Sequence, residues 1–271
     1  MKKEKSVLTD VPETMLWTLH NRAVEAMRSD GIIKDEKAIE IYQSIDYDYE
    51  KSFGKAEPSH AIRSVDFDKE IRQFLKKYPD GTIVNLGEGL ETQRFRFNET
   101  KALWLSVDLP VAMEIRERFI QPDDTHLHLP ISATERAWFD SVPKDKPVFI
   151  SAQGLFMYLT EEEVRLLVQD IAKTFKSAYL MFDTIPIWLS NKTLSKNGWA
   201  KTKNYITPKM PWGINHNKIV ATFKHWLSDD IEITVKSYST FPRGVVKWIF
   251  LLFSTAPLFK NFVPSIVKIC F

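Results

Sequence analysis

Hydrophobic residues change their spacing near residue 81, and this change divides the chain into two parts. Before it, apolar positions recur at helical spacing over 13–28 and again over 67–78. After it, short β-rich runs are separated by helical ones. These runs lie at 82–87, 102–109, 126–131, 147–154 and 178–185. Strands that alternate with helices indicate a parallel sheet, so the pattern predicts an α/β fold behind a helical N-terminal part.

The clearest helix is predicted at 158–175, between the fourth and fifth of these runs. Thr160 and Glu163 form the two ends of a capping box. An apolar stripe at helical spacing then comprises Val164, Leu167, Val168, Ile171 and Phe175. We expect this stripe to pack in the core.

The segment 184–222 interrupts the alternation. It is rich in lysine and contains Trp188, Trp199, Tyr205 and Trp212. A long aromatic stretch of this kind indicates a functional insertion. Strand-like runs resume at 231–239 and 265–271. We expect one domain over 1–271, made of a helical section (1–80), a core (81–183), the insertion (184–222) and the completion of the sheet (223–271).

Composition limits the classes of partner. The chain has 271 residues, 44% of them hydrophobic and 27% charged, which is typical of a globular protein. The net charge is +2 with acids and bases interleaved, so no nucleic-acid partner is expected. Cys270 is the single cysteine, which excludes an internal disulfide and fits a reducing compartment. The basic start lacks an apolar segment typical of a secretory signal, so we expect a cytoplasmic protein.

The apolar stretch at 245–264 is the one candidate for membrane contact. Its uncharged part, 248–259, contains Pro257 and is well short of the roughly 20 residues that span a bilayer. We expect a buried helix followed by a last strand, with an interfacial anchor as the alternative.

A glycine loop follows the first strand-like run. Gly87 and Gly89 flank Glu88, and a helix is expected after them, so free backbone N–H groups and space for a ligand are predicted there. Asp108 ends the next strand about 20 residues later, where such folds bind ribose hydroxyls. A carboxylate that merely caps a strand end is the alternative for Asp108.

The charge of this loop distinguishes between two adenosine cofactors. A dinucleotide site usually has a third glycine where this chain has Thr92, and its pyrophosphate would be repelled by Glu88 and Glu91. A sulfonium in place of the phosphates tolerates a nearby carboxylate. The loop therefore favours S-adenosylmethionine over NAD, unless both glutamates point to solvent, which remains open.

Together these stretches resemble the leucine carboxyl methyltransferase family, and within it the bacterial branch that includes polyketide O-methyltransferases. The matching segments occur in the family's order over nearly the whole chain: LWTLHNRAVEAMRSDGIIKDEKA, HAIRSVDFDKEIRQFL, TIVNLGEGLETQRFRF, LWLSVDLP, AQGLFMYLTEEEV and FDTIPIW. The resemblance implies a class I methyltransferase fold, a Rossmann-like seven-stranded, mostly parallel sheet with an antiparallel last strand. It also implies that the N-terminal helices and the insertion after the fifth strand close over the substrate.

The resemblance also implies roles for individual residues. Arg63 matches the arginine that binds the methionyl carboxylate of S-adenosylmethionine, a contact well suited to a guanidinium. Gly87 matches the first loop glycine and Asp108 the ribose-binding acid. Ala133 and Thr134 fall where the family flanks adenine, and Gln153 where it faces the methionine part. The expected cofactor site further includes Glu88, Gly89 and Leu109.

The chain departs from the family pattern at three points near this site. The usual loop has an aspartate where this chain has Glu91, and an arginine where it has Gln93. Gln153 replaces an acid, so it keeps hydrogen-bonding capacity without attracting the α-ammonium as a charge. His20 lies near a position that is basic in some members, with a solvent-facing histidine as the alternative.

Methyl transfer from a sulfonium is an in-line displacement, so positioning in a dry pocket supplies much of the catalysis. A carboxylate acceptor needs no base, whereas a phenol gains from one. The candidate bases are His216 and Tyr158. Trp188, Tyr205 and Trp212 can form an aromatic wall for a substrate, with Lys201 or Lys203 to attract an anion. Packing of these aromatic residues onto the sheet is the alternative. No metal-ligand spacing is present, and no metal is expected.

The sequence therefore predicts a methyltransferase that acts on a carboxyl or hydroxyl oxygen of a small molecule, of the kind found in polyketide-like secondary metabolism. The alternatives are a protein carboxyl methyltransferase, a cofactor-binding scaffold without turnover, and a peripheral membrane protein. The sequence determines neither the substrate nor the oligomeric state.

Overall fold

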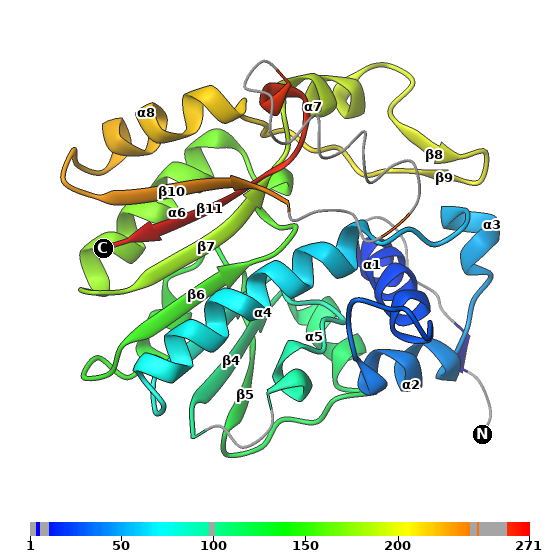
Figure 1. Ribbon diagram of the computed structural model, residues 1–271, viewed down its shortest axis with the longest axis horizontal. Helices are drawn as coiled ribbons and strands as arrows, with labels where there is room; N and C mark the ends of the chain where they lie inside the picture. Colours follow the sequence, from blue (N-terminus) through cyan, green and yellow to red (C-terminus); the bar gives the residue numbers. More distant parts are fainter. Residues whose placement is uncertain (1–3, 6–10, 98–100, 239–242, 244–258) are drawn as a thin grey trace.

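Seven strands form one sheet at the centre of the computed structural model, which describes residues 4–5, 11–97, 101–238, 243 and 259–271 (Figure 1). The strand order is β10-β11-β7-β6-β3-β4-β5. The strands span β3 (Thr82–Leu86), β4 (Leu103–Asp108), β5 (His126–Pro130), β6 (Val148–Ala152), β7 (Tyr179–Thr184), β10 (Glu232–Ser237) and β11 (Ser265–Cys270). β11 alone among them runs antiparallel to its neighbours, β7 and β10. The predicted strands and the antiparallel last strand are confirmed.

Both faces of the sheet are buried. Successive residues of each central strand point to opposite faces, and helices cover each face. On one face, Ile83, Trp104 and Phe149 pack against α4 (Ser59–Lys77). On the other, Val84, Leu105 and their equivalents pack against α6 (Glu161–Thr174) and α8 (His216–Trp226). Figure 1 shows α4 in front of the sheet and α6 behind it.

α6 forms as its sequence predicts. The Thr160 side chain accepts the Glu163 N–H, and the Glu163 carboxylate accepts the Thr160 N–H, which completes the capping box. The expected apolar stripe, Val164, Leu167, Val168, Ile171 and Phe175, is buried along its whole length.

A second hydrophobic cluster holds the N-terminal helices together beside the sheet. α1 (Val11–Ala26), α2 (Glu36–Ser44) and α3 (Tyr49–Phe53) contribute to it, together with α5 (Pro110–Arg116). Its buried aromatic members are Trp17, Tyr49, Phe53 and, from the insertion, Tyr205. A short parallel pair, β1 (Glu4–Lys5) and β2 (Ile45–Asp46), lies at its edge. We call α1 to α4 the helical cover.

His20 belongs to this cover and is 1% exposed, so the solvent-facing alternative is wrong. Its Nε2 bonds to the Gly54 carbonyl and its Nδ1 to the Tyr42 hydroxyl, both at 3.2 Å. The histidine therefore connects α1 to the end of α3.

Two expectations about local structure need correction. The glycine loop is followed by a single 3₁₀ turn, Gln93–Arg96, where a helix was expected. The side chains of this turn are held by buried carboxylates, which keep the chain close to the cover. The segment 184–222 contains α7 (Ile187–Leu194) and the hairpin β8 (Ala200–Thr202) with β9 (Tyr205–Ile206), but its expected end falls within α8, whose Ile219 and Phe223 belong to the main core. The helix expected before the last strand lies outside the described residues.

Candidate cofactor and substrate site

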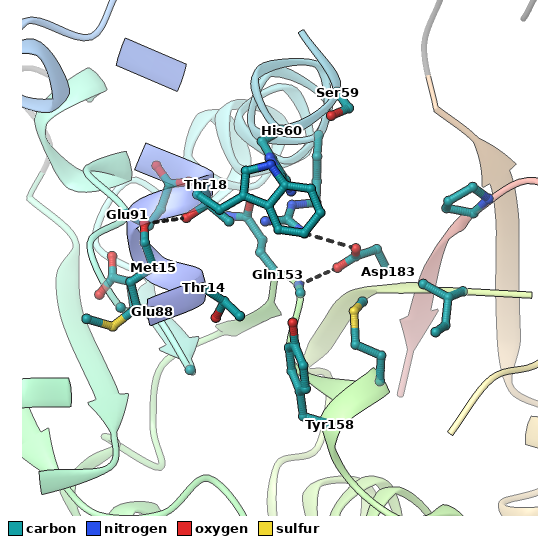
Figure 2. A pocket seen from close by; sticks show the side chains of 18 of the residues that line it. Thr14, Met15, Thr18, Ser59, His60, Glu88, Glu91, Gln153, Tyr158 and Asp183 are labelled. Atoms are coloured by element: carbon teal, nitrogen blue, oxygen red, sulfur yellow. Dashed lines mark hydrogen bonds and ion pairs between the residues drawn. The ribbon is translucent and has the colours of Figure 1, made fainter. Parts of the chain in front are cut away.

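A cavity of about 250 Å³ lies at the carboxyl ends of β3, β6 and β7, enclosed by the helical cover (Figure 2). The chain passes from β3 to β4 on one side and later to β6 on the other, so β3 is the strand at which the sheet order reverses. Open α/β sheets bind ligands in the crevice at such a point. From the strands the lining includes Gly87, Ser151, Gln153 and Asp183; from the cover it includes Thr18, Trp17, His60 and Arg63.

The glycine loop turns out of β3 in conformations that favour glycine. Gly87 and Gly89 have φ angles of +62° and +53°, in the left-handed region. A Cβ on Gly87 would lie 2.8 Å from a methyl carbon of Leu155, and a Cβ on Gly89 would lie 2.9 Å from Cγ of Met15. Both positions therefore require glycine for conformation and for space.

Glu88 is buried beneath this loop. Its carboxylate accepts hydrogen bonds from the Asn85 amide and the Ser106 hydroxyl, and Arg116 lies 3.2 Å away. Burial raises the pKa of Glu88, while Arg116 and the two hydrogen bonds oppose that shift.

Glu91 lies in a larger buried network. Its carboxylate contacts Arg96 at 2.7 Å, Arg22 of α1 at 3.3 Å and the Ser64 hydroxyl of α4 at 2.9 Å. Burial tends to raise its pKa, but the two arginines prevail and hold the pKa far below its usual range. Arg96 also contacts Asp35 at the start of α2. We call these groups, with Asp68 beside them, the loop–cover network.

Neither glutamate points to solvent, so that alternative is wrong: Glu88 is 8% exposed and Glu91 6%. Each carboxylate is compensated by arginine. The loop therefore presents no free negative charge, and repulsion of a pyrophosphate does not follow from this geometry as we expected.

Asp108 ends β4 beside the same loop. Its two carboxylate oxygens accept the Gly89 N–H at 2.7 Å and the Leu109 N–H at 2.8 Å. Burial raises its pKa, and these two hydrogen bonds oppose the shift. Leu109 is 44% exposed next to it.

Ala133 and Thr134 follow β5, one strand further from the cavity. The Ala133 carbonyl accepts the Trp138 indole N–H at 3.1 Å, so this group serves the fold. Together with Asp108 these residues lie on the β4–β5 side of the loop, outside the cavity lining.

Arg63 lines the cavity from the second turn of α4 and forms a buried ion pair. Its Nη1 donates to Oδ2 of Asp183 at 3.2 Å, and the Tyr238 hydroxyl donates to the same oxygen at 3.0 Å. The Gly154 N–H occupies the other oxygen at 2.6 Å. Figure 2 shows Asp183 close to Gln153 on the cavity wall.

Two buried polar atoms in this cluster have no hydrogen-bond partner among the described residues: Nε of Arg63 and Oε1 of Gln153. A buried donor or acceptor without a partner costs roughly 1–3 kcal/mol. An α-amino acid group supplies a carboxylate for the donor and an ammonium for the acceptor. The orphaned pair thus fits the methionine end of S-adenosylmethionine.

The two candidate bases differ in position. His216 bonds to the Ser265 hydroxyl at 2.9 Å and does not line the cavity. Tyr158 does line it (Figure 2), but burial raises the pKa of its phenol to about 12. At neutral pH Tyr158 is therefore a hydrogen-bond donor and cannot serve as a base in its resting state.

None of the expected substrate residues lines the cavity. Trp212 and Tyr205 are buried in the main core and in the cover, at 3% and 4% exposure, so packing explains both. Trp188 is largely exposed and donates to the Phe262 carbonyl. Lys201 is paired with Glu57 at 2.8 Å. The aromatic wall is formed instead by Trp17 and Trp199.

The sequence did not predict several of the lining residues, among them Asp183, His60 and Trp17. Asp183 ends a strand, as Asp108 does, and that position was the available signal. His60 shares a helical face with Arg63 through its spacing of three residues. Trp17 carried no signal beyond its place in an apolar stripe.

Comparison with known proteins agrees with this architecture. The model for the leucine carboxyl methyltransferase family matches residues 15–172. The tetracenomycin polyketide synthesis O-methyltransferase TcmP of Streptomyces glaucescens is 29% identical over 77% of each chain. An S-adenosyl-L-methionine-dependent methyltransferase of Gibberella zeae, dpfgK, is 26% identical over 66% of each. The plantazolicin methyltransferase BamL, solved with SAH, shares the fold at a TM-score of 0.53 and 12% identity, over 96% of this chain and 99% of that one.

The fold and the matches define an S-adenosylmethionine-dependent methyltransferase of class I. Because the family model covers more than half of its length, the chain belongs to the leucine carboxyl methyltransferase family. S-adenosylmethionine is its cofactor, as the sequence predicted.

Two features are absent from the part of the chain that the structure describes. No helix within it is long and apolar enough to cross a membrane. No group of three or more histidine, cysteine, aspartate or glutamate side chains there is arranged to hold a metal ion. The absence of a metal in the reaction stays a prediction.

Proposed function

We propose that this methyltransferase transfers the methyl group of S-adenosylmethionine to a carboxyl or hydroxyl oxygen of a small molecule. The relative TcmP, named as an O-methyltransferase of polyketide synthesis, supports oxygen as the acceptor atom and a polyketide-like acceptor.

The observation that carries the proposal is the orphaned pair on the cavity wall. Arg63 Nε would donate to the methionyl carboxylate and Gln153 Oε1 would accept from the α-ammonium. The adenosine half would then extend across the glycine loop toward β4 and β5. There Asp108 would bind the ribose, and Ala133 and Thr134 would flank the adenine.

The cofactor supplies an electrophilic methyl group, and the chain supplies alignment and exclusion of water. Tyr158 holds its proton at neutral pH, and the carboxylate of Asp183 is occupied by Arg63, Tyr238 and Gly154. A carboxylate acceptor needs no proton removed, so among the two acceptor types it is the better supported.

Calorimetry with S-adenosylhomocysteine tests the cofactor site. We expect Arg63→Leu and Gln153→Leu each to weaken binding about 10- to 100-fold, because each removes a hydrogen bond to a charged group. Gln169→Leu is the matched control, since Gln169 bonds to the Trp226 carbonyl away from the cavity. Unchanged affinity in both test variants would contradict the assignment.

Two alternatives are separated by one labelling experiment. Labelled S-adenosylmethionine, incubated with the enzyme and a cell lysate, should place label in the small-molecule fraction. Label in protein would favour a protein carboxyl methyltransferase. Because Gln153 lacks the usual charge, a scaffold without turnover is the third outcome, and it would bind cofactor with no transfer to either fraction.

A further inference from the structure

His60 lies in the first turn of α4, one turn before Arg63, and lines the same cavity. Its ring packs edge-to-face with Trp17, with centroids 5.3 Å apart. Asn21 of α1 contacts the same ring, with its Nδ2 2.8 Å from His60 Nδ1. The methyl-transfer role assigned above does not use this pair.

The orientation of the Asn21 amide follows from its other hydrogen bond. Asn21 Oδ1 accepts the backbone N–H of Glu57 at 3.2 Å, so the oxygen must face Glu57 and the NH₂ group must face His60. An amide nitrogen only donates, and His60 Nδ1 must therefore carry the lone pair. In a neutral imidazole the proton is then on Nε2.

Two observations leave this Nε2–H available. It has no hydrogen-bond partner among the described residues, and the half-buried ring of His60 lines the cavity. Burial, with Arg63 and Arg22 nearby, keeps the pKa of His60 well below its ordinary value. The ring is thus neutral at physiological pH and offers one donor.

We propose that Asn21 locks His60 in the Nε2–H tautomer, and that His60 thereby acts as a fixed hydrogen-bond donor to a carbonyl or ionised oxygen of the methyl acceptor. This inference rests on the proposed function. His60 selects and orients an oxygen-bearing substrate and takes no proton from it. The cofactor's own carboxylate is the other possible recipient, but Arg63 already provides an unpaired donor for it.

The tautomer can be observed without any substrate. In the full-length protein labelled with ¹⁵N-histidine, long-range ¹H–¹⁵N spectra distinguish the two ring nitrogens, and His60→Gln identifies the signal of His60 among the six histidines. We expect a neutral Nε2–H form that does not titrate between about pH 5 and 8. A protonated nitrogen at Nδ1 would overturn the proposal.

Asn21→Asp is the decisive variant. Its carboxylate still accepts the Glu57 N–H but accepts from His60 as well, so the proton should move to Nδ1 or the ring should become charged within that pH range. A tautomer unchanged in Asn21→Asp would show that Asn21 does not set it. Thermal melting confirms that the variant is folded.

Function is tested with labelled S-adenosylmethionine and an organic extract of the source cells at increasing concentration. His60→Leu should raise the half-saturating extract concentration about 3- to 10-fold while S-adenosylhomocysteine affinity stays within about 3-fold, and His60→Gln should recover most of the loss through its amide donor. In Asn21→Asp, transfer should become pH-dependent. If His60→Leu instead loses S-adenosylhomocysteine binding, His60 belongs to the cofactor site and the proposal fails. If the unmodified enzyme transfers no methyl group, the proposed function fails, while the tautomer measurement stands separately.

Discussion

At the residue scale, the site is defined by polar atoms that the fold leaves without partners. Arg63 is anchored at Nη1 by Asp183, which leaves Nε for a ligand, and Gln153 presents an oxygen nearby. The anchor fixes the guanidinium before the cofactor arrives, which lowers the entropy lost on binding.

Restoring the acid at position 153 should strengthen cofactor binding. In Gln153→Glu the carboxylate would pair with the α-ammonium as a charge-assisted hydrogen bond, and we expect S-adenosylhomocysteine to bind about 3- to 10-fold more tightly at pH 7. Calorimetry measures the change in affinity. Gln153→Leu serves as the comparison, because we expect it to weaken S-adenosylhomocysteine binding. Weaker binding by the glutamate variant would show that its carboxylate is desolvated without reaching the ammonium.

Gly87→Ala should impair both folding and cofactor binding. The φ of +62° costs an alanine about 1–2 kcal/mol, and its Cβ would collide with Leu155 beside the ligand. Gly198→Ala is a matched control, since Gly198 has a φ of +61° and its Cβ would contact only Ile206 in the hairpin. Melting should show a loss of stability in both, and calorimetry a loss of S-adenosylhomocysteine affinity in Gly87→Ala alone.

At the element scale, the loop–cover network joins the glycine loop to α1, α2 and α4. Glu91 and Glu88 lie three residues apart in the same loop and have opposite pKa shifts, because two arginines hold Glu91 ionised whereas burial dominates at Glu88. The two carboxylates therefore make different contributions to stability.

Glu91→Gln should destabilise the protein much more than Glu88→Gln. Removing one partner of a buried pair costs about 3–5 kcal/mol, and both Arg22 and Arg96 would lose one of the carboxylates that compensate their charge. The folded pKa of Glu91 is lowered, so its contribution is complete above the unfolded pKa of about 4.3 and is lost as pH falls below it.

Urea unfolding at several pH values checks this sign. Between about pH 5 and 3 the free energy of unfolding should fall less steeply in Glu91→Gln than in the unmodified protein. Glu88→Gln, which resembles the protonated form that burial favours, should keep the steeper acid limb. Equal acid limbs in all three proteins would exclude Glu91 as the titrating group.

The elements themselves were largely predictable, because their signals are local. All seven sheet strands and α6 with its capping box follow from periodicity and caps. The predictions about side-chain positions that were wrong depend on tertiary contacts. Trp212 and Tyr205 carry no local sign of whether an aromatic ring faces a ligand or a core, and both face cores. Likewise the pairing of Glu91 with Arg22 joins residues far apart in the sequence, which no periodicity reveals.

At the scale of the whole molecule, cofactor binding should stabilise the fold as one unit. S-adenosylhomocysteine at about 100 times its Kd should add about 2.7 kcal/mol to the free energy of unfolding, which corresponds to a rise in Tm of several degrees. NAD at the same concentration should give no shift. This comparison by scanning calorimetry matters because the loop's own charge does not exclude a dinucleotide; a shift with NAD would contradict the cofactor assignment.

The loop–cover network also bears on how this enzyme can be recombined with its relatives. An aspartate at position 91 is one methylene shorter and would draw its carboxylate away from Arg22 and Arg96. A loop with aspartate at this position, grafted alone, would therefore place its carboxylate too far from these two arginines to pair with them. A chimera that keeps these contacts must exchange the loop together with α1, α2 and α4, although these segments lie far apart in the sequence.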